Sequence, residues 1–251
     1  MDRLGYTAMT AASRTMTALA VRSNNLANVN TPGFRSDLEQ SVSVPVQGYG
    51  YDSRHLAMAQ SNGVNLAAGA LMATGRDMDF AIKGPGLIAV QGQDGEAYTR
   101  HGSLQVDADM QLTINGRAVL GEGGPIVLPQ FDSIRIANDG RISVLPRGEP
   151  QMVEVDQIKL VDVPAAQLSK DNAGLLVTRD GMPAATDENV QLASGFLEAS
   201  NVSAIDELVG TMSLSRLFET QVKMMKAAED LSTAGNLSLI HISEPTRHAQ
   251  I

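Results

Sequence analysis

The apolar residues of this chain follow a helical period at both ends and a strand period in between. Near the N-terminus, apolar or small residues recur at heptad spacing, with one polar gap at Ser23; they are Met9, Ala12, Met16, Leu19 and Leu26. This stripe predicts an amphipathic helix that packs along a partner. The helix should end near residues 28–30, because Thr31 precedes Pro32 and residues before proline avoid the helical conformation.

A second helix is predicted between Asn201 and Asp230, where the chain has one glycine and no proline. Ser200 or Asn201 is one candidate N-cap, and Ser203 followed by Asp206 is another. The apolar face of this helix is wider than a two-stranded seam, so the helix should contact more than one neighbour. That face consists of Ile205, Leu208, Val209, Met212, Leu214, Leu217, Phe218, Val222, Met224 and Met225.

The same periodicity would suit two core helices of an ordinary globular domain. The two helices lie at opposite ends of the chain, however, and are separated by residues of a different character. This arrangement favours a coiled-coil-like pair that runs side by side and against copies of itself.

Between the helices, short apolar stretches alternate with turn-forming dipeptides. The dipeptides that favour hairpins are Asn62-Gly63, Asp94-Gly95, Asn115-Gly116, Asp139-Gly140 and Asp180-Gly181. The strand candidates are residues 87–91, 111–114, 117–120, 133–136, 141–144 and 153–163. Because no long helical pattern separates them, an antiparallel barrel or sandwich is favoured over a parallel sheet. The predicted fold class is α+β, with terminal helices flanking a β-rich antiparallel middle domain.

Composition excludes several classes of function. The formal net charge of -9 and the lack of a dense Lys/Arg run argue against nucleic-acid binding. The chain has no cysteine, so neither a disulfide framework nor thiolate chemistry is possible. The N-terminal stretch interrupts its apolar residues with Thr, Ser and Arg, which predicts neither a cleavable signal peptide nor a membrane span.

No catalytic, cofactor-binding or metal-binding residue is predicted. The histidines form no close pair at metal-binding spacing. They are His55, His101, His241 and His248. The glycine-rich stretches 84–86 and 121–124 lead into strands, whereas a phosphate-binding loop leads into a helix. Asp107 and Asp109 form too short a series for a Ca²⁺ loop and suit a turn.

The stretch from Ser23 to Phe34 reads SNNLANVNTPGF and places amide side chains, Leu26 and a turn-forming Gly33 at a helix end. An asparagine-rich cap would account for one or two of these residues but not for the whole block. The block resembles the N-terminal signature of flagellar rod and hook proteins. Three further stretches are similar to the proximal rod members of that family. They are residues 1–9, 75–124 and 195–230.

The resemblance extends to about Asn236 and implies a structural subunit of the proximal rod of the bacterial flagellar basal body. It implies export through the flagellar type III apparatus and assembly in the periplasm with copies of itself and other rod proteins. It also implies a role in motility without direct membrane insertion. The alternatives are a distal rod or hook protein of the same family and, from another class, a β-rich secreted enzyme or binding module.

Packing residues also follow from the resemblance, and they accompany Met9, Met16 and Leu19 of the N-terminal stripe. The residues that it assigns to packing are Asn24, Asn25, Leu26, Asn28, Gly33, Phe34, Glu198, Asn201, Val202, Met212, Phe218 and Met225. The expected domains are a helical domain made of residues 1–34 with 200–236, a β-rich domain at 35–199, and a tail at 237–251. Isolated helices are marginal in water, so we expect both helical ends to order only on assembly.

The tail from Leu237 to Ile251 reads LSLIHISEPTRHAQI and departs from the family pattern, which continues the helix with apolar residues. Pro245 would break such a helix. The tail resembles translated sequencing-adapter sequence, and we predict that it is foreign to the gene. Resequencing the locus across codons 230 to 251 should give a different continuation. Recovery of the same tail in an independent genomic read would contradict the prediction.

Overall fold

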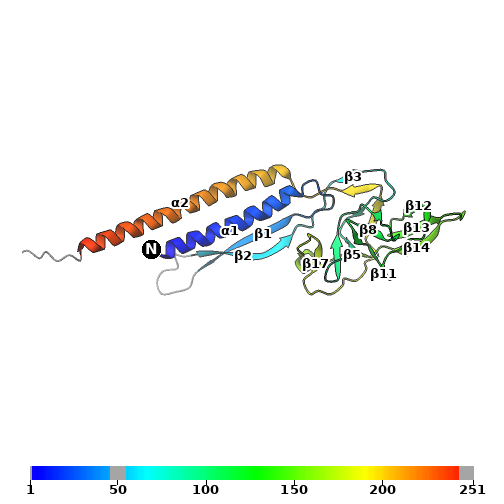
Figure 1. Cartoon of the computed structure of the whole chain (residues 1–251), viewed down its shortest axis with the longest axis horizontal. Coiled ribbons are helices and arrows are strands. Elements are labelled where there is room, and N and C mark those ends of the chain that lie inside the picture. The colour runs from blue at the N-terminus through cyan, green and yellow to red at the C-terminus, as the bar shows by residue number, and fades with distance from the viewer. Residues whose placement is uncertain (1, 46–54, 243–251) are drawn as a thin grey trace, which may run out of the picture. The chain divides into compact units, whose positions relative to one another are not determined.

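The computed structural model describes residues 2–45 and 55–242 of the chain (Figure 1). The chain divides into two compact units. The helical unit consists of residues 1–23, 39–61 and 205–251, and the β-rich unit consists of residues 24–38 and 62–204. The domain limits expected from the sequence lie between residues 34 and 35 and between residues 199 and 200. They differ from the limits of these units and stay a prediction.

The helical unit contains most of α1 (Asp2–Ala27) and of α2 (Ala204–Ile242), together with most of the two-stranded sheet of β1 (Asp37–Pro45) and β2 (His55–Val64). The two helices lie alongside each other in opposite directions (Figure 1). A buried hydrogen bond of 3.0 Å from the Thr15 hydroxyl to Oε1 of Gln221 joins them. Arg22 and Glu207 form an ion pair of 3.0 Å near the C-terminal end of α1.

The β-rich unit is built from short antiparallel strands. Its strands are β3 (Leu71–Ala73), β4 (Phe80–Lys83), β5 (Leu87–Gln91), β6 (Glu96–Thr99), β7 (Gln105–Val106), β8 (Leu112–Ile114), β9 (Arg117–Ala118), β10 (Leu120–Gly121), β11 (Gly124–Pro125), β12 (Phe131–Ile136), β13 (Arg141–Pro146), β14 (Val153–Gln157), β15 (Leu160–Val161), β16 (Leu168–Lys170), β17 (Leu176–Thr178), β18 (Gln191–Ser194) and β19 (Phe196–Glu198). A 3-10 turn, η1 (Ala165–Gln167), precedes β16.

The largest sheet has the strand order β15-β5-β6-β17-β16, and a separate meander has the order β12-β13-β14. The other sheets contain two or three strands, and none of the sheets in the described residues closes into a barrel. Two apolar clusters fill the unit. The larger one includes Phe80, Ile88, Leu112, Ile126 and Ile142, and the smaller one includes Leu87, Tyr98 and Leu168.

Tyr98 shows how the smaller cluster accommodates a polar group. Its ring is fully buried, and its hydroxyl accepts a hydrogen bond of 2.7 Å from the backbone N–H of Ala184. Burial raises the pKa of the Tyr98 hydroxyl to about 12. The hydroxyl therefore stays neutral inside the core at physiological pH.

Both terminal helices and most of the predicted strands are present. α1 ends at Ala27, one residue before the predicted range, and α2 begins directly after Ser203, the second of the two predicted starts. α2 continues to Ile242, beyond Asn236, and Pro245 lies outside the described residues. The antiparallel pairing is confirmed, whereas the closed barrel is not observed and the sandwich and coiled-coil details stay predictions.

Two hairpin predictions are wrong. Asn62-Gly63 lies inside β2, a strand that was not predicted. Asp180-Gly181 follows β17 in a turn, but β17 pairs with β6 and β16 and not with the next strand, β18. The dipeptide Asn115-Gly116 does connect β8 to β9, and both of its residues have positive φ angles, of 51° and 74°. Positive φ at both central residues is what a type I′ hairpin turn requires.

We predict that Phe80→Ala strongly destabilises the β-rich unit. Phe80 is 0% exposed in the larger apolar cluster, so its removal leaves a cavity that should cost about 3–5 kcal/mol. Phe196 is 38% exposed on β19, and Phe196→Ala is the matched control with a smaller effect. Urea unfolding of the two variants measures the difference, and equal losses would contradict the assignment of Phe80 to the core.

Candidate functional site

The block that carries the family resemblance covers the end of α1 and the loop after it. We call residues 24–38, which run from the end of α1 to the start of β1 within the β-rich unit, the terminal segment. α1 ends at Ala27, and the backbone N–H of Asn28 still donates to the carbonyl oxygens of Asn24 and Asn25. The Asn25 side chain closes the loop, because its amide donates to the Asp37 carbonyl and its oxygen accepts from the Asp37 N–H at 2.9 Å. Asn25 is 2% exposed, so this amide acts as an internal brace.

Gly33 allows the terminal segment to lie directly against the rest of the β-rich unit. Its N–H donates to the Glu198 carbonyl at 2.7 Å, and its φ angle is 68°. A Cβ atom here would collide with the backbone of Arg100 and His101. Glycine is therefore required both for the backbone conformation and for the close approach.

The terminal segment is anchored by three buried charged residues, which we call the Glu198 cluster (Arg35, Arg100 and Glu198). Nη2 of Arg35 lies 2.8 Å from Oε1 of Glu198, and Nη1 of Arg100 lies 3.0 Å from Oε2. The side chains of Arg35 and Glu198 are each 2% exposed, and that of Arg100 is 4% exposed. The backbone N–H of Gly69 also donates to Oε1, at 2.7 Å. One carboxylate thus receives contacts from three separate parts of the chain.

Burial lowers the pKa of both arginines, and Glu198 opposes this shift. Arg35 lowers the pKa of Arg100 further, as expected for two positive groups in one buried site. Both guanidiniums stay charged because arginine remains protonated in proteins. Removing one partner from such a buried group typically costs about 3–5 kcal/mol. The cluster is therefore sensitive to the loss of the shared carboxylate.

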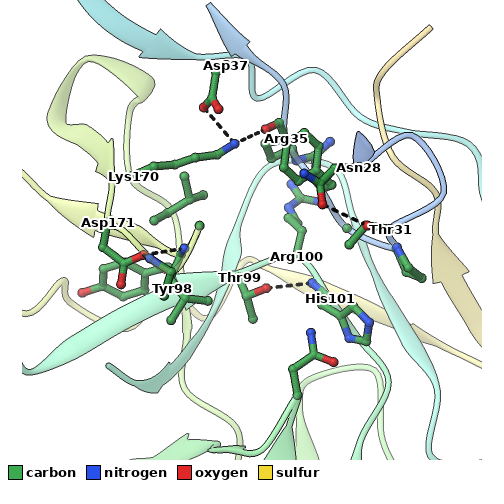
Figure 2. Close-up of a pocket in the computed structure, with 18 of the residues that line it drawn as sticks. Asn28, Thr31, Arg35, Asp37, Tyr98, Thr99, Arg100, His101, Lys170 and Asp171 are labelled. Carbon is green, nitrogen blue, oxygen red and sulfur yellow. Dashed lines mark hydrogen bonds and ion pairs between the residues drawn. The ribbon is translucent and has the colours of Figure 1, made fainter. Parts of the chain in front are cut away.

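Lys170 holds the same segment from another side (Figure 2). Its Nζ atom lies 2.8 Å from Oδ1 of Asp37 and donates to the carbonyl oxygen of Arg35. The same atom lies 4.0 Å from the ring centroid of Phe34, within the range of a cation–π contact. Lys170 at the end of β16 thus contacts three consecutive parts of the loop.

Asn201 provides a further link within the β-rich unit. Its side-chain oxygen accepts from the Ser36 N–H at 2.8 Å, and its amide donates to the Asn65 carbonyl at 2.8 Å and to the Ala67 carbonyl at 3.0 Å. A single amide therefore connects the terminal segment, the stretch after β2 and the stretch before α2.

A cavity of about 380 Å³ lies beside these contacts (Figure 2). It is lined by the terminal segment, by residues 98–101 and by residues 170–176. His101 faces this cavity; burial lowers its pKa, and Asp79 opposes the shift.

Among the described residues, no group of three or more His, Cys, Asp or Glu side chains could hold a metal ion. The described helices also include none long and apolar enough to cross a membrane.

The predicted packing residues fall in both units. Those in the β-rich unit are Asn24, Asn25, Leu26, Asn28, Gly33, Phe34, Glu198, Asn201 and Val202. Those in the helical unit are Met9, Met16, Leu19, Met212, Phe218 and Met225. The structure brings Asn25, Gly33, Phe34, Glu198 and Asn201 into one bonded region.

Sequence reasoning missed Arg35, Arg100 and Lys170. Arg35 directly follows Phe34, the last residue of the recognised block, and this position was the only signal in the sequence that could have marked it as a packing residue. Arg100 lies 98 residues from its partner Glu198, and no local pattern reveals such a pair.

We predict that Gly33→Ala destabilises the chain more than Gly75→Ala does. Both glycines have a φ angle of 68°, so both substitutions carry the same backbone strain, about 1–2 kcal/mol. Only the Gly33 variant adds a collision with backbone atoms, whereas a Cβ at Gly75 would meet no atom within 4 Å. The free energies of unfolding in urea give the comparison, and indistinguishable values would show that the close approach at Gly33 does not matter.

Three protein-family models match the chain in separate stretches. They are "Flagella basal body rod protein" at residues 6–35, "Flagellar hook protein FlgE/F/G D1 domain" at residues 81–144, and "Flagellar basal body rod FlgEFG protein C-terminal" at residues 193–236. Each member of the Glu198 cluster lies in a different one of these matches. The cluster therefore joins the three parts that define the family models.

Whole-chain comparisons agree. The chain is 39% identical to the flagellar basal-body rod protein FlgF of Escherichia coli K12 over 246 residues, covering 94% of this chain and 98% of that protein. It is 39% identical to FlgF of Salmonella typhimurium LT2, covering 92% and 95%. It is 30% identical to the basal-body rod protein FlgG of Bacillus subtilis 168, covering 92% and 97%. The chain therefore belongs to the family of flagellar basal-body rod proteins and is a structural subunit of the flagellar rod.

Proposed function

We propose that this chain is a subunit of the proximal rod that assembles through its terminal helices with copies of itself and with other rod proteins. The flagellar type III apparatus would export it without a cleaved signal peptide, and assembly would take place in the periplasm. It has no catalytic role, cofactor or metal in this proposal, and it neither binds nucleic acid nor inserts directly into a membrane. Its contribution to motility is mechanical.

The observation that carries the proposal is the number of apolar side chains left exposed on the two helices. On α2, Ile205 is 74% exposed, Val209 58% and Met212 57%. On α1, Met9 is 53% exposed and Met16 51%, while Ala8, Ala12 and Thr15 form the buried side. Exposed apolar groups that gather on one element mark an interaction surface. Neighbouring subunits of the rod are the natural partners for this surface.

The choice of proximal over distal rod has a separate support. FlgF of Escherichia coli and FlgF of Salmonella typhimurium are each 39% identical to this chain, whereas FlgG of Bacillus subtilis is 30% identical. The resemblance noted above for residues 1–9, 75–124 and 195–230 favours the same proximal branch. The domain limits at 34/35 and 199/200, and a foreign tail at 237–251, remain part of this proposal.

We predict that the double variant Met16→Asp with Leu19→Asp is exported but does not assemble. A carboxylate placed without a partner in a packed apolar seam costs several kcal/mol, so the rod should fail to form and cells should not swim. The measurements are motility in soft agar and the amount of this chain in the periplasmic fraction and in isolated basal bodies.

The matched control is Thr17→Asp, which adds a charge to an exposed position of α1 outside the stripe. This control should leave motility intact. Normal swimming by the double variant would remove the basis for the seam. Loss of the chain from the periplasmic fraction would instead point to a failure of export.

A further inference from the structure

We propose that the Glu198 cluster is a clasp that keeps the terminal segment folded against the rest of the β-rich unit in the isolated chain. Residues 24–38 would then belong to the folded part of the free subunit. The N-terminal stretch that is expected to order only on assembly would then end before Asn24 rather than at Phe34. The inference concerns the isolated chain, so it can fail while the proposed function holds.

The charges of the Glu198 cluster come from separate stretches of the chain. Arg35 belongs to the terminal segment, Arg100 directly follows β6, and Glu198 is the last residue of β19. If the terminal segment detached, the Arg35 guanidinium would enter water and Glu198 would lose one of its two cationic partners. Glu198 is 2% exposed, so water would not replace that partner unless the site opened. The docked form is therefore favoured over a partly open one.

Backbone hydrogen bonds extend the attachment along the terminal segment. The N–H groups of Gly33 and Ser36 donate to Glu198 and Asn201, at 2.7 and 2.8 Å. The Asn65 N–H donates back to the Ser36 carbonyl at 2.9 Å. Because these partners all belong to the β-rich unit, the bonds do not need another subunit.

The terminal segment also has its own internal closure. Asn25 braces Asp37, and Lys170 contacts Asp37 and Phe34 from the opposite side. A segment held at its start, middle and end behaves as part of the domain rather than as a free chain terminus. The clasp would therefore fix Asn24 as the point at which the helical end leaves the folded unit.

The test is amide hydrogen exchange on the purified full chain, verified as a monomer. Arg35→Met removes the guanidinium of the terminal segment and keeps the Arg100–Glu198 pair. The amides of Gly33, Ser36 and Asp37 should then exchange at least about tenfold faster, because local opening no longer breaks a buried ion pair. The amides of β5 and β6 should keep their protection, which shows that the core stays folded.

A second variant tests the shared carboxylate. Glu198→Gln keeps the side-chain volume but leaves two buried guanidiniums without their anion, so the amide of Gly69 should also lose protection. The control Glu96→Gln removes the ion pair with Lys159 in the same unit, and it should leave the terminal segment unchanged.

Two results would overturn the clasp. One is exchange of Gly33, Ser36 and Asp37 in the unmodified chain at the rates of an unstructured peptide. The other is an Arg35→Met variant whose exchange at these amides stays within about twofold of the unmodified chain. If Glu198→Gln does not fold, the Arg35→Met result decides alone.

Discussion

The carboxylate of Glu198 is the contact on which the arrangement of the β-rich unit depends. It meets two guanidiniums and one backbone N–H, and these groups come from stretches far apart in the sequence. A buried carboxylate with fewer partners would be costly, whereas this one has its oxygen atoms occupied by charged and polar donors. Gly33, Asn201 and Lys170 add further contacts to the same terminal segment.

The Glu198 cluster joins the three stretches of the chain that match family models. The N-terminal match contains Arg35, the central match contains Arg100 and the C-terminal match contains Glu198. All three residues belong to the β-rich unit, so the ion pairs join separate stretches of the chain within that unit.

Much of the fold could be predicted from the sequence because it rests on local patterns. The heptad stripe indicates α1, the turn dipeptides indicate several hairpins, and residues 87–91 match β5. The β1 and β2 strands were missed although Leu38, Val42 and Val44 alternate with polar residues in β1, and Asn62-Gly63 lies within β2 where a turn was expected. The Arg100–Glu198 pair spans 98 residues, a separation at which no period or motif reports a contact.

The hydrogen bonds from Gly33 to Glu198 and from Ser36 to Asn201 affect how the length of the chain between them can vary. They hold the two ends of a long excursion of the chain within hydrogen-bonding distance of each other. Extra residues in an exposed turn, such as the stretch between β13 and β14, would lengthen the excursion without separating its ends. The entropy cost of a longer loop grows only slowly with its length. The stretch between Ser36 and Glu198 can thus be enlarged or reduced at such a turn while its two attachment points keep their spacing.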